Sequence, residues 1–204
     1  MKNKQAMSIL LSLVVAGLPM AGFAGDEIRT EYFNDGRLKS EEHYRDGMLE
    51  GISRRYDEDG NLREERYENN VREGFSRHYY GSTGEHLKKE IMFQNGKAQG
   101  PYREYYESGR LMTEGFRRDG MNEGLWKEYY ENGILRLEKE YVNGKQERSA
   151  RLYYETGELE KELHFSHGKL DGPARDFYKT GKIREELVYL RGRLVSRAVF
   201  PAEG

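Results

Sequence analysis

Glycine-ended turns recur at a near-constant interval and restrict what this chain can fold into more than any other feature. The first turns end at Gly36, Gly60, Gly84, Gly109, Gly133, Gly157 and Gly181, in steps of 24 or 25 residues. A second series alternates with the first and ends at Gly47, Asn70, Gly96, Gly120, Gly144, Gly168 and Gly192. Self-similarity at a fixed period is the signature of a repeat architecture, in which each unit packs only on its neighbours.

The unit from Leu125 to Arg148 has the clearest sequence, LWKEYYENGILRLEKEYVNGKQER. Asn-Gly occurs in it at 132–133 and again at 143–144, between runs with high β-propensity. Asn-Gly in this setting is the strongest local signal for a β-hairpin, because both residues of the tight turn need a positive φ. We therefore predict two such turns in each unit.

These observations predict an all-β fold, an elongated single-sheet antiparallel β-meander of about seven 24-residue hairpin repeats. One continuous domain is expected over residues 25–204. Its repeats are placed at 28–51, 52–74, 75–100, 101–124, 125–148, 149–172 and 173–196, with a tail at 197–204. The third repeat is longer than the others, which predicts an enlarged loop at its first turn.

Charged side chains form two columns when each unit is numbered from 1 to 24. A two-residue turn at positions 8 and 9 places position 6 across from 11, as Tyr130 from Leu135, and position 3 across from 14. Position 3 holds Arg54, Arg77, Arg103, Lys127, Arg151 and Arg175, and position 14 holds Glu41, Glu65, Glu90, Glu114, Glu138, Glu162 and Glu186. The predicted result is a ladder of alternating charge along the sheet. It is either a solvated structural face, because exposed ion pairs contribute only about 0–1 kcal/mol, or a binding face that presents arginines.

Aromatic side chains form further columns and are expected to build a thin core. One column follows each glutamate by two or three residues and comprises Tyr44, Tyr67, Phe93, Phe116, Tyr141, Phe165 and Tyr189. Together with positions 5 and 6 and Tyr102, these columns account for all 16 tyrosines, so none is left for a special site. Trp126 is the only tryptophan and shares position 2 with Tyr102.

The first 24 residues predict a secretory signal peptide cleaved after Ala24. Lys2 and Lys4 precede a short apolar core, and a small-x-small cleavage site follows it. The alternative is an uncleaved anchor. The chain has no cysteine, so it forms no disulfide, and a cysteine-free secreted chain indicates a periplasmic or secreted bacterial protein.

The charge balance excludes a nucleic-acid partner. The full chain has a formal net charge of −2, and loss of Lys2 and Lys4 with the signal peptide makes the mature chain more negative. A nucleic-acid-binding domain would carry a basic footprint. The charged fraction of 34% is high, but 12% aromatic residues and strict periodicity argue against disorder.

The units resemble the MORN-repeat variant family of bacteria. The stretch GLWKEYYENGILRLEKEYVNGK follows the family pattern G-x-W-x-x-Y-Y-x-N-G-x-L-x-x-E with a later aromatic and a second N-G-K turn, and the resemblance covers residues 28–196. It implies a twisted β-meander of consecutive hairpins and no particular activity. Bacterial members labelled as YwqK-like antitoxins imply binding of a protein toxin, whereas eukaryotic members are linked to phospholipids and scaffolding. Asn70, Arg148 and the signal peptide depart from the pattern.

No constellation of residues predicts catalysis or metal binding. His164 and His167 are three residues apart, but a zinc site needs three or four convergent ligands. None of the familiar nucleophile, metalloprotease, phosphate-loop or dinucleotide motifs occurs. The glutamate column repeats in every unit, as a structural residue does, so we expect no enzyme, no cofactor and no metal.

The sequence favours a non-enzymatic periplasmic scaffold that binds a protein partner, in its specific form an immunity or antitoxin-like protein against an envelope toxin. The alternative is a binding module for cell-wall glycan or phospholipid headgroups, because stacked aromatics suit sugars and the Arg/Lys column suits phosphates. The contacts are expected in the central, aromatic-rich region. The residues are Arg103, Tyr105, Tyr106, Trp126, Lys127, Tyr129, Tyr130, Arg151, Tyr153 and Tyr154.

Overall fold

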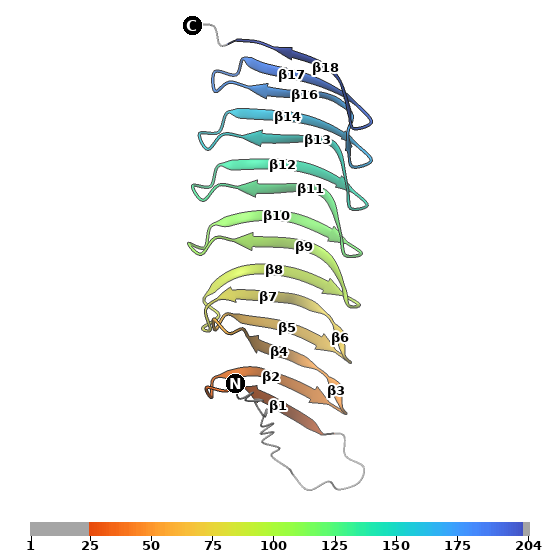
Figure 1. Cartoon of the computed structure of the whole chain (residues 1–204). Helices are drawn as coiled ribbons and strands as arrows, with labels where there is room; N and C mark the ends of the chain where they lie inside the picture. Colours follow the sequence, from red (N-terminus) through yellow and green to blue (C-terminus); the bar gives the residue numbers. More distant parts are fainter. Residues whose placement is uncertain (1–24, 202–204) are drawn as a thin grey trace, which may run out of the picture.

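A computed structural model describes residues 25–201 and consists of one elongated antiparallel sheet (Figure 1). Consecutive strands pair with one another from β1 (Asp26–Tyr32) at one end to β18 (Arg193–Val199) at the other. The predicted all-β, single-sheet meander is confirmed. The predicted signal peptide at 1–24 lies outside the described residues.

The remaining strands follow in chain order. They are β2 (Leu38–Arg45), β3 (Met48–Leu49), β4 (Gly51–Tyr56), β5 (Leu62–Glu68), β6 (Val71–Arg72), β7 (Gly74–Tyr80), β8 (His86–Gln94), β9 (Lys97–Tyr105), β10 (Leu111–Arg118), β11 (Met121–Tyr129), β12 (Leu135–Val142), β13 (Lys145–Tyr153), β14 (Leu159–Ser166), β15 (Lys169–Leu170), β16 (Gly172–Phe177) and β17 (Ile183–Leu190). The two-residue strands β3, β6 and β15 each continue, after a one-residue break, into the next strand.

The two turns of each unit differ from one another. In the second turn, Asn143 and Gly144 have φ values of 51° and 75°, as the Asn-Gly signal predicts. In the first turn only Gly133 has a positive φ, 89°. The Gly133 amide donates to the Tyr130 carbonyl at 2.9 Å, and the Tyr130 amide donates to the Ile134 carbonyl at 2.8 Å. The prediction of two left-handed residues in the first turn was therefore wrong, and this turn is a longer loop that ends in one left-handed glycine.

The longer turn shifts the pairing next to it. Leu135 lies across from Tyr129 and not, as predicted, from Tyr130. A bulge at Arg136 then absorbs the extra residue, so that Lys127 pairs with Glu138 as predicted. The error in turn geometry is thus confined to the residues beside the turn.

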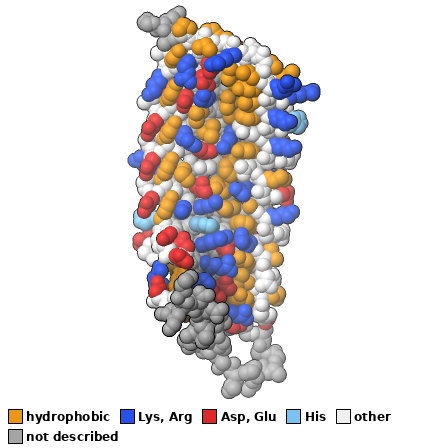
Figure 2. Space-filling model, in the orientation of Figure 1, with side chains coloured by type: hydrophobic (Ala, Val, Ile, Leu, Met, Phe, Trp, Pro, Cys, Tyr) orange, Lys and Arg blue, Asp and Glu red, His pale blue; other side chains and the backbone are white. Residues whose placement is uncertain are grey.

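Side chains alternate between two faces of the sheet, as they do in any β-strand. We call the face with Lys127 and Glu138 the ladder face and the opposite face, with Trp126, the Trp face. Position 2 of the units forms the best-buried column, which lies on the Trp face and comprises Ser53, Ser76, Tyr102, Trp126, Ala150 and Ala174. The surface in Figure 2 shows that side chains of each kind gather in columns along the molecule.

Hydrogen bonds at the second turns tie each unit to the one before it. The Gly144 amide donates to the Asn122 carbonyl at 3.0 Å, and the Asn143 amide donates to the Glu123 carboxylate at 2.8 Å. The same pair of bonds joins His167 and Gly168 to the preceding unit. The side chain at this position, which is acidic in five units and Gln99 in one, therefore caps the next second turn.

Candidate functional site

The ladder face carries the alternating charges that the sequence predicts. Arg151 lies between Glu138 and Glu162, with a nitrogen 3.1 Å from an oxygen of each. Hydrogen bonds to these two carboxylates raise the pKa of Arg151. Arg54 and Arg175 bridge two glutamates in the same way. The side chains of these arginines are about two-fifths exposed, so each pair contributes little alone and the column acts as a network.

One member of the predicted glutamate column was wrong. Arg54 pairs with Glu64, 2.9 Å away, and not with Glu65. The unit at 52–74 is one residue shorter than the unit at 125–148, and the pairing of β4 with β5 has no bulge. Without the bulge the register moves by one residue, which turns Glu65 to the Trp face.

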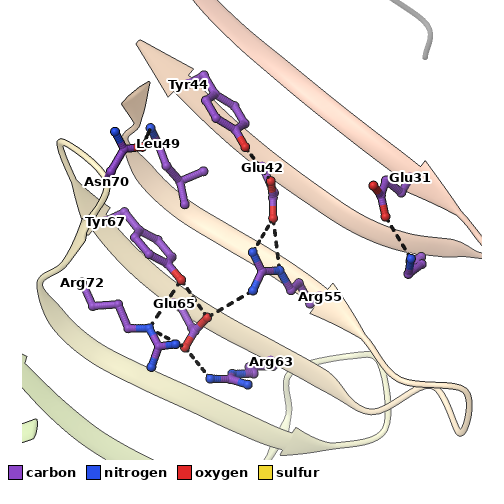
Figure 3. A network of polar contacts seen from close by, with 11 residues as sticks. Glu31, Glu42, Tyr44, Leu49, Arg55, Arg63, Glu65, Tyr67, Asn70 and Arg72 are labelled. Atoms are coloured by element: carbon purple, nitrogen blue, oxygen red, sulfur yellow. Dashed lines mark hydrogen bonds and ion pairs between the residues drawn. The ribbon is translucent and has the colours of Figure 1, made fainter. Parts of the chain in front are cut away.

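Glu65 is one of the most deeply buried side chains described, with 2% of its surface exposed. Its carboxylate lies 2.5 Å from Arg63, 3.2 Å from Arg72 and 3.7 Å from Arg55, and it accepts a hydrogen bond from the Tyr67 hydroxyl at 3.0 Å (Figure 3). A buried carboxylate is tolerated only when its charge and oxygens are satisfied in this way. The cluster is therefore the polar core of the N-terminal units.

Six of the ten predicted contact residues lie on the ladder face. Arg103, Lys127 and Arg151 follow one another on β9, β11 and β13, and Tyr105, Tyr129 and Tyr153 end the same strands. The Tyr129 hydroxyl donates to Glu114 at 2.7 Å, and the Tyr153 hydroxyl donates to Glu138 at 3.1 Å. Burial and the bond to Glu114 raise the pKa of Tyr129 to about 12. Tyr129 and Tyr153 therefore belong to the charge network and stay protonated at neutral pH.

Three other predicted residues hold successive units together at the first turns. The hydroxyls of Tyr106, Tyr130 and Tyr154 donate to the carbonyls of Tyr129, Tyr153 and Phe177, at 2.7, 2.8 and 2.8 Å. Each acceptor lies in the following unit, 23 residues further along the chain. Their phenol groups therefore have a structural role that the sequence did not indicate.

Trp126 lies in the core of the Trp face and is 6% exposed. Its ring centre is 4.9 Å from that of Tyr102 and 6.1 Å from that of Tyr141. Its indole N–H donates to the Phe116 carbonyl at 3.2 Å. A Cβ atom at Gly115 would stand 2.3 Å from the indole ring, so only glycine fits beneath this side chain. The structure separates Trp126 from the predicted residues of the ladder face.

Sequence reasoning missed Phe116 and Leu125, which are 41% and 50% exposed. The prediction that Phe116 belongs to the buried aromatic column was wrong, because Phe116 lies on the ladder face and Arg117 occupies the column position instead. The signal was available, because Phe116 follows Glu114 by two residues, whereas the other aromatics follow the glutamate of their ladder by three.

Lys127 stands beside these apolar residues and differs from the arginines of its column. It pairs in register with Glu114 on one side and Glu138 on the other. Nevertheless, within residues 25–201 its ammonium group makes no ion pair or side-chain hydrogen bond, whereas Arg54, Arg103 and Arg151 all do. The centre of the ladder face thus combines two exposed apolar side chains with an unpaired cation.

The two histidines singled out in the sequence make separate contacts. The His164 ring shares a hydrogen bond with the Pro173 carbonyl at 2.8 Å, and the His167 ring lies 2.9 Å from the Ser166 hydroxyl. The described residues contain no group of three or more His, Asp or Glu side chains placed to hold a metal ion. In the same part of the chain, no helix is long and apolar enough to cross a membrane.

Six stretches of the chain match the MORN repeat variant family, at residues 28–46, 49–69, 98–119, 122–143, 149–167 and 170–190. They cover more than half of the sequence. The chain belongs to this family. MORN repeats in general bind proteins or membranes, and the family is not a catalytic one. This MORN protein has no match among the curated proteins searched. The unmatched segment between 69 and 98 contains most of the unit at 75–100, including its first turn.

Proposed function

We propose that this MORN protein is a non-enzymatic scaffold that binds a protein partner in the periplasm or after secretion. The supporting observation is the centre of the ladder face, where exposed Phe116 and Leu125 lie on neighbouring strands beside the unpaired Lys127. Neighbouring exposed apolar side chains with a polar rim are typical of interaction sites. We call Phe116, Leu125 and Lys127 the central patch.

The surroundings of the central patch match the anatomy of a protein interface. Arg103 on β9 and Arg151 on β13 are held in ion pairs with Glu90, Glu138 and Glu162. An apolar centre with a polar, solvent-exposed rim is the usual arrangement in protein–protein contacts. The predicted residues Arg103, Tyr105, Lys127, Tyr129, Arg151 and Tyr153 form that rim, and Trp126 contributes from the opposite side by stiffening β10 and β11.

In the specific form of the proposal, the chain is an immunity protein that neutralises a toxin acting in the envelope. The motivation is the predicted signal peptide at residues 1–24 together with a family whose repeats bind proteins. A toxin partner would be held by the central patch. Cells that lack the gene should then be killed by the toxin of neighbouring or sibling cells, and equal survival with and without the gene would reject this form.

The partner itself is tested by affinity capture. The mature chain is immobilised and exposed to envelope extract, and captured proteins are identified by mass spectrometry. We expect Leu125→Asp and Lys127→Glu to reduce capture about tenfold or more, because they remove the apolar and cationic centre. Ile52→Asp is the matched control, since Ile52 occupies the same position in another unit and is 45% exposed.

Two results would contradict the proposal. The first is that every protein captured by the wild type is also captured by Leu125→Asp. The second is sedimentation of the wild-type protein with peptidoglycan or anionic vesicles but without any protein partner. That outcome would support the alternative function, in which the repeats bind glycan or phospholipid headgroups, and membrane-binding MORN repeats are the reason to include it.

A further inference from the structure

Three residues that break the repeat meet on the Trp face of β10 and β11. Gly115 is a glycine outside the turns, Trp126 is the only tryptophan, and Arg117 stands where the other units have tyrosine or phenylalanine. A residue that serves the sheet recurs from unit to unit, as the glutamate column does. Three exceptions at one place therefore indicate a local requirement that the fold does not impose.

Arg117 lies against two aromatic rings. Its guanidinium carbon is 4.9 Å from the centre of Tyr102 and 5.9 Å from the centre of Trp126. Gly115 lets the indole lie close to the backbone, because any larger residue would overlap the ring. Lys89 approaches the Tyr102 ring as well, with its ammonium nitrogen 5.2 Å from the centre. Stacking on aromatic faces fixes the plane of a guanidinium group and leaves its two terminal nitrogens available.

The charge of Arg117 is not neutralised. Among the residues described, no carboxylate forms an ion pair with it, and its side chain makes no hydrogen bond. Its Nε is buried without an acceptor. Arg72 offers a contrast, because it also lies over a ring, that of Phe93 at 5.2 Å, but is paired with Glu65. Lys89, the other cation beside Tyr102, is paired with Glu104 at 3.3 Å.

We propose that Arg117 binds a carboxylate group in an acidic segment of a protein. A planar, partly buried guanidinium that is held in place matches the two oxygens of a carboxylate in a bidentate contact. An isolated cation favours a carboxylate over a phosphate-rich surface, which requires several unpaired cations. The site lies on the face opposite the central patch and does not depend on it. Together with the proposed function, it would let the protein join two partners, one on each face.

Trp126 provides the measurement, since its fluorescence reports only on this site. The mature protein is titrated with hexaglutamate peptide, and hexaglutamine is the neutral control. We expect a saturable change in emission with hexaglutamate alone, weakened by salt. Arg117→Gln should raise the Kd about tenfold or more and Arg117→Lys by less, because lysine keeps the charge but loses the planar fork. Arg118→Gln, which alters the neighbouring arginine on the ladder face, should leave the Kd unchanged.

The proposal is overturned if Arg117→Gln binds hexaglutamate as well as the wild type does. It is also overturned if hexaglutamine gives the same change in emission. A third contrary result is that inorganic phosphate or phosphatidylglycerol vesicles displace bound hexaglutamate more effectively than a second glutamate-rich peptide does. Circular dichroism controls for folding, and Arg117→Lys keeps the test valid if Arg117→Gln unfolds. Leu125→Asp should bind hexaglutamate normally, so failure here and failure of the proposed function are distinguishable.

Discussion

Gly115 and Trp126 are matched in size, because the indole ring fills the space left by the missing side chain of the glycine. Gly115 has an ordinary strand conformation, so its backbone would accept alanine, but the indole occupies the space that a Cβ atom needs. A large aromatic side chain packed over a strand glycine compensates for the missing side chain. The only tryptophan of the chain is therefore tied to the only glycine that lies inside a described strand without a positive φ.

Gly115→Ala should lower the free energy of unfolding by about 1–3 kcal/mol, because the new methyl group overlaps the indole. Trp126→Ser removes that overlap, so the double variant should be more stable than the sum of the two single effects predicts. Chemical denaturation of all four proteins gives the coupling energy, with Thr113→Ala on the same strand as the control. Additive effects would mean that Gly115 does not serve Trp126.

Arg148 is a second residue with a local effect on stability, which arises from its backbone conformation. It has a φ of 60° at a position where five other units have a left-handed glycine. Arg148→Gly should raise the free energy of unfolding by about 0.5–1 kcal/mol, because an L-residue is strained there. The loss of its exposed ion pair with Glu140 offsets only a small part of this gain. Gly124→Arg is the reverse change and should destabilise the protein, as measured by thermal unfolding; a more stable Gly124→Arg would contradict the argument.

At the scale of the element, each hairpin is joined to the next at both of its turns. Backbone amides of the second turn bond to the preceding unit, and a tyrosine hydroxyl near the first turn bonds to the following one. Such contacts between nearest neighbours are the source of stability in repeat proteins. The turns are therefore joints between units as well as connections between strands.

Tyr130→Phe should cost about 1 kcal/mol, because it removes one hydrogen bond to the Tyr153 carbonyl and leaves the ring in place. Combining it with Tyr106→Phe and Tyr154→Phe should give a nearly additive loss, since the three bonds lie in different units. Tyr105→Phe is the control, because within residues 25–201 the Tyr105 hydroxyl makes no hydrogen bond. Urea denaturation measures each change, and an equal effect of Tyr105→Phe would remove the role assigned to Tyr130.

At the scale of the whole molecule, a sheet with little apolar core depends on partly buried charges whose pKa values are shifted. Burial raises the pKa of Glu128, but hydrogen bonds from Arg136 and Lys139 outweigh it and hold the pKa below its ordinary value. Burial, followed by the positive charge of Arg63 and Lys89, lowers the pKa of His78 to about 4. Both groups bind protons more readily in the unfolded chain than in the folded sheet.

Stability should accordingly fall on acidification in two stages. His78 stays neutral in the folded state while its unfolded counterpart protonates below pH 6.5, so stability is lost between pH 6.5 and about 4. Glu128 adds a further loss as the pH falls below 4.5. His78→Gln should reduce the first stage by on the order of 1 kcal/mol, once solvent screening of a half-buried ring is allowed for. Unfolding midpoints between pH 8 and 4 test this, and an identical profile for His78→Gln would assign the first stage to other groups.

The periodic residues made most of the fold predictable. The 24-residue spacing, the Asn-Gly turns and the columns at positions 3 and 14 led to the single antiparallel sheet and the charge ladder. Local signals suffice for such a fold because each unit contacts only its neighbours. The errors concern the first-turn geometry, Glu65 and Phe116, and all three arise where a turn or a bulge changes the register by one residue. A one-residue change exchanges the two faces of a strand, and its sign in the sequence is only a spacing that differs by one residue, as between Glu114 and Phe116.

The sequence by itself determined the repeat, the hairpins and the pairing of Arg151 with its glutamates, because these follow from short-range patterns that recur in six or seven units. Only the tertiary structure decided which side chains share a face where the repeat is interrupted. It placed Glu65 among three arginines, Phe116 on the surface and Arg117 over Tyr102 and Trp126. The physical reason is that bulges and left-handed residues set the local register, and their positions depend on how adjacent strands meet.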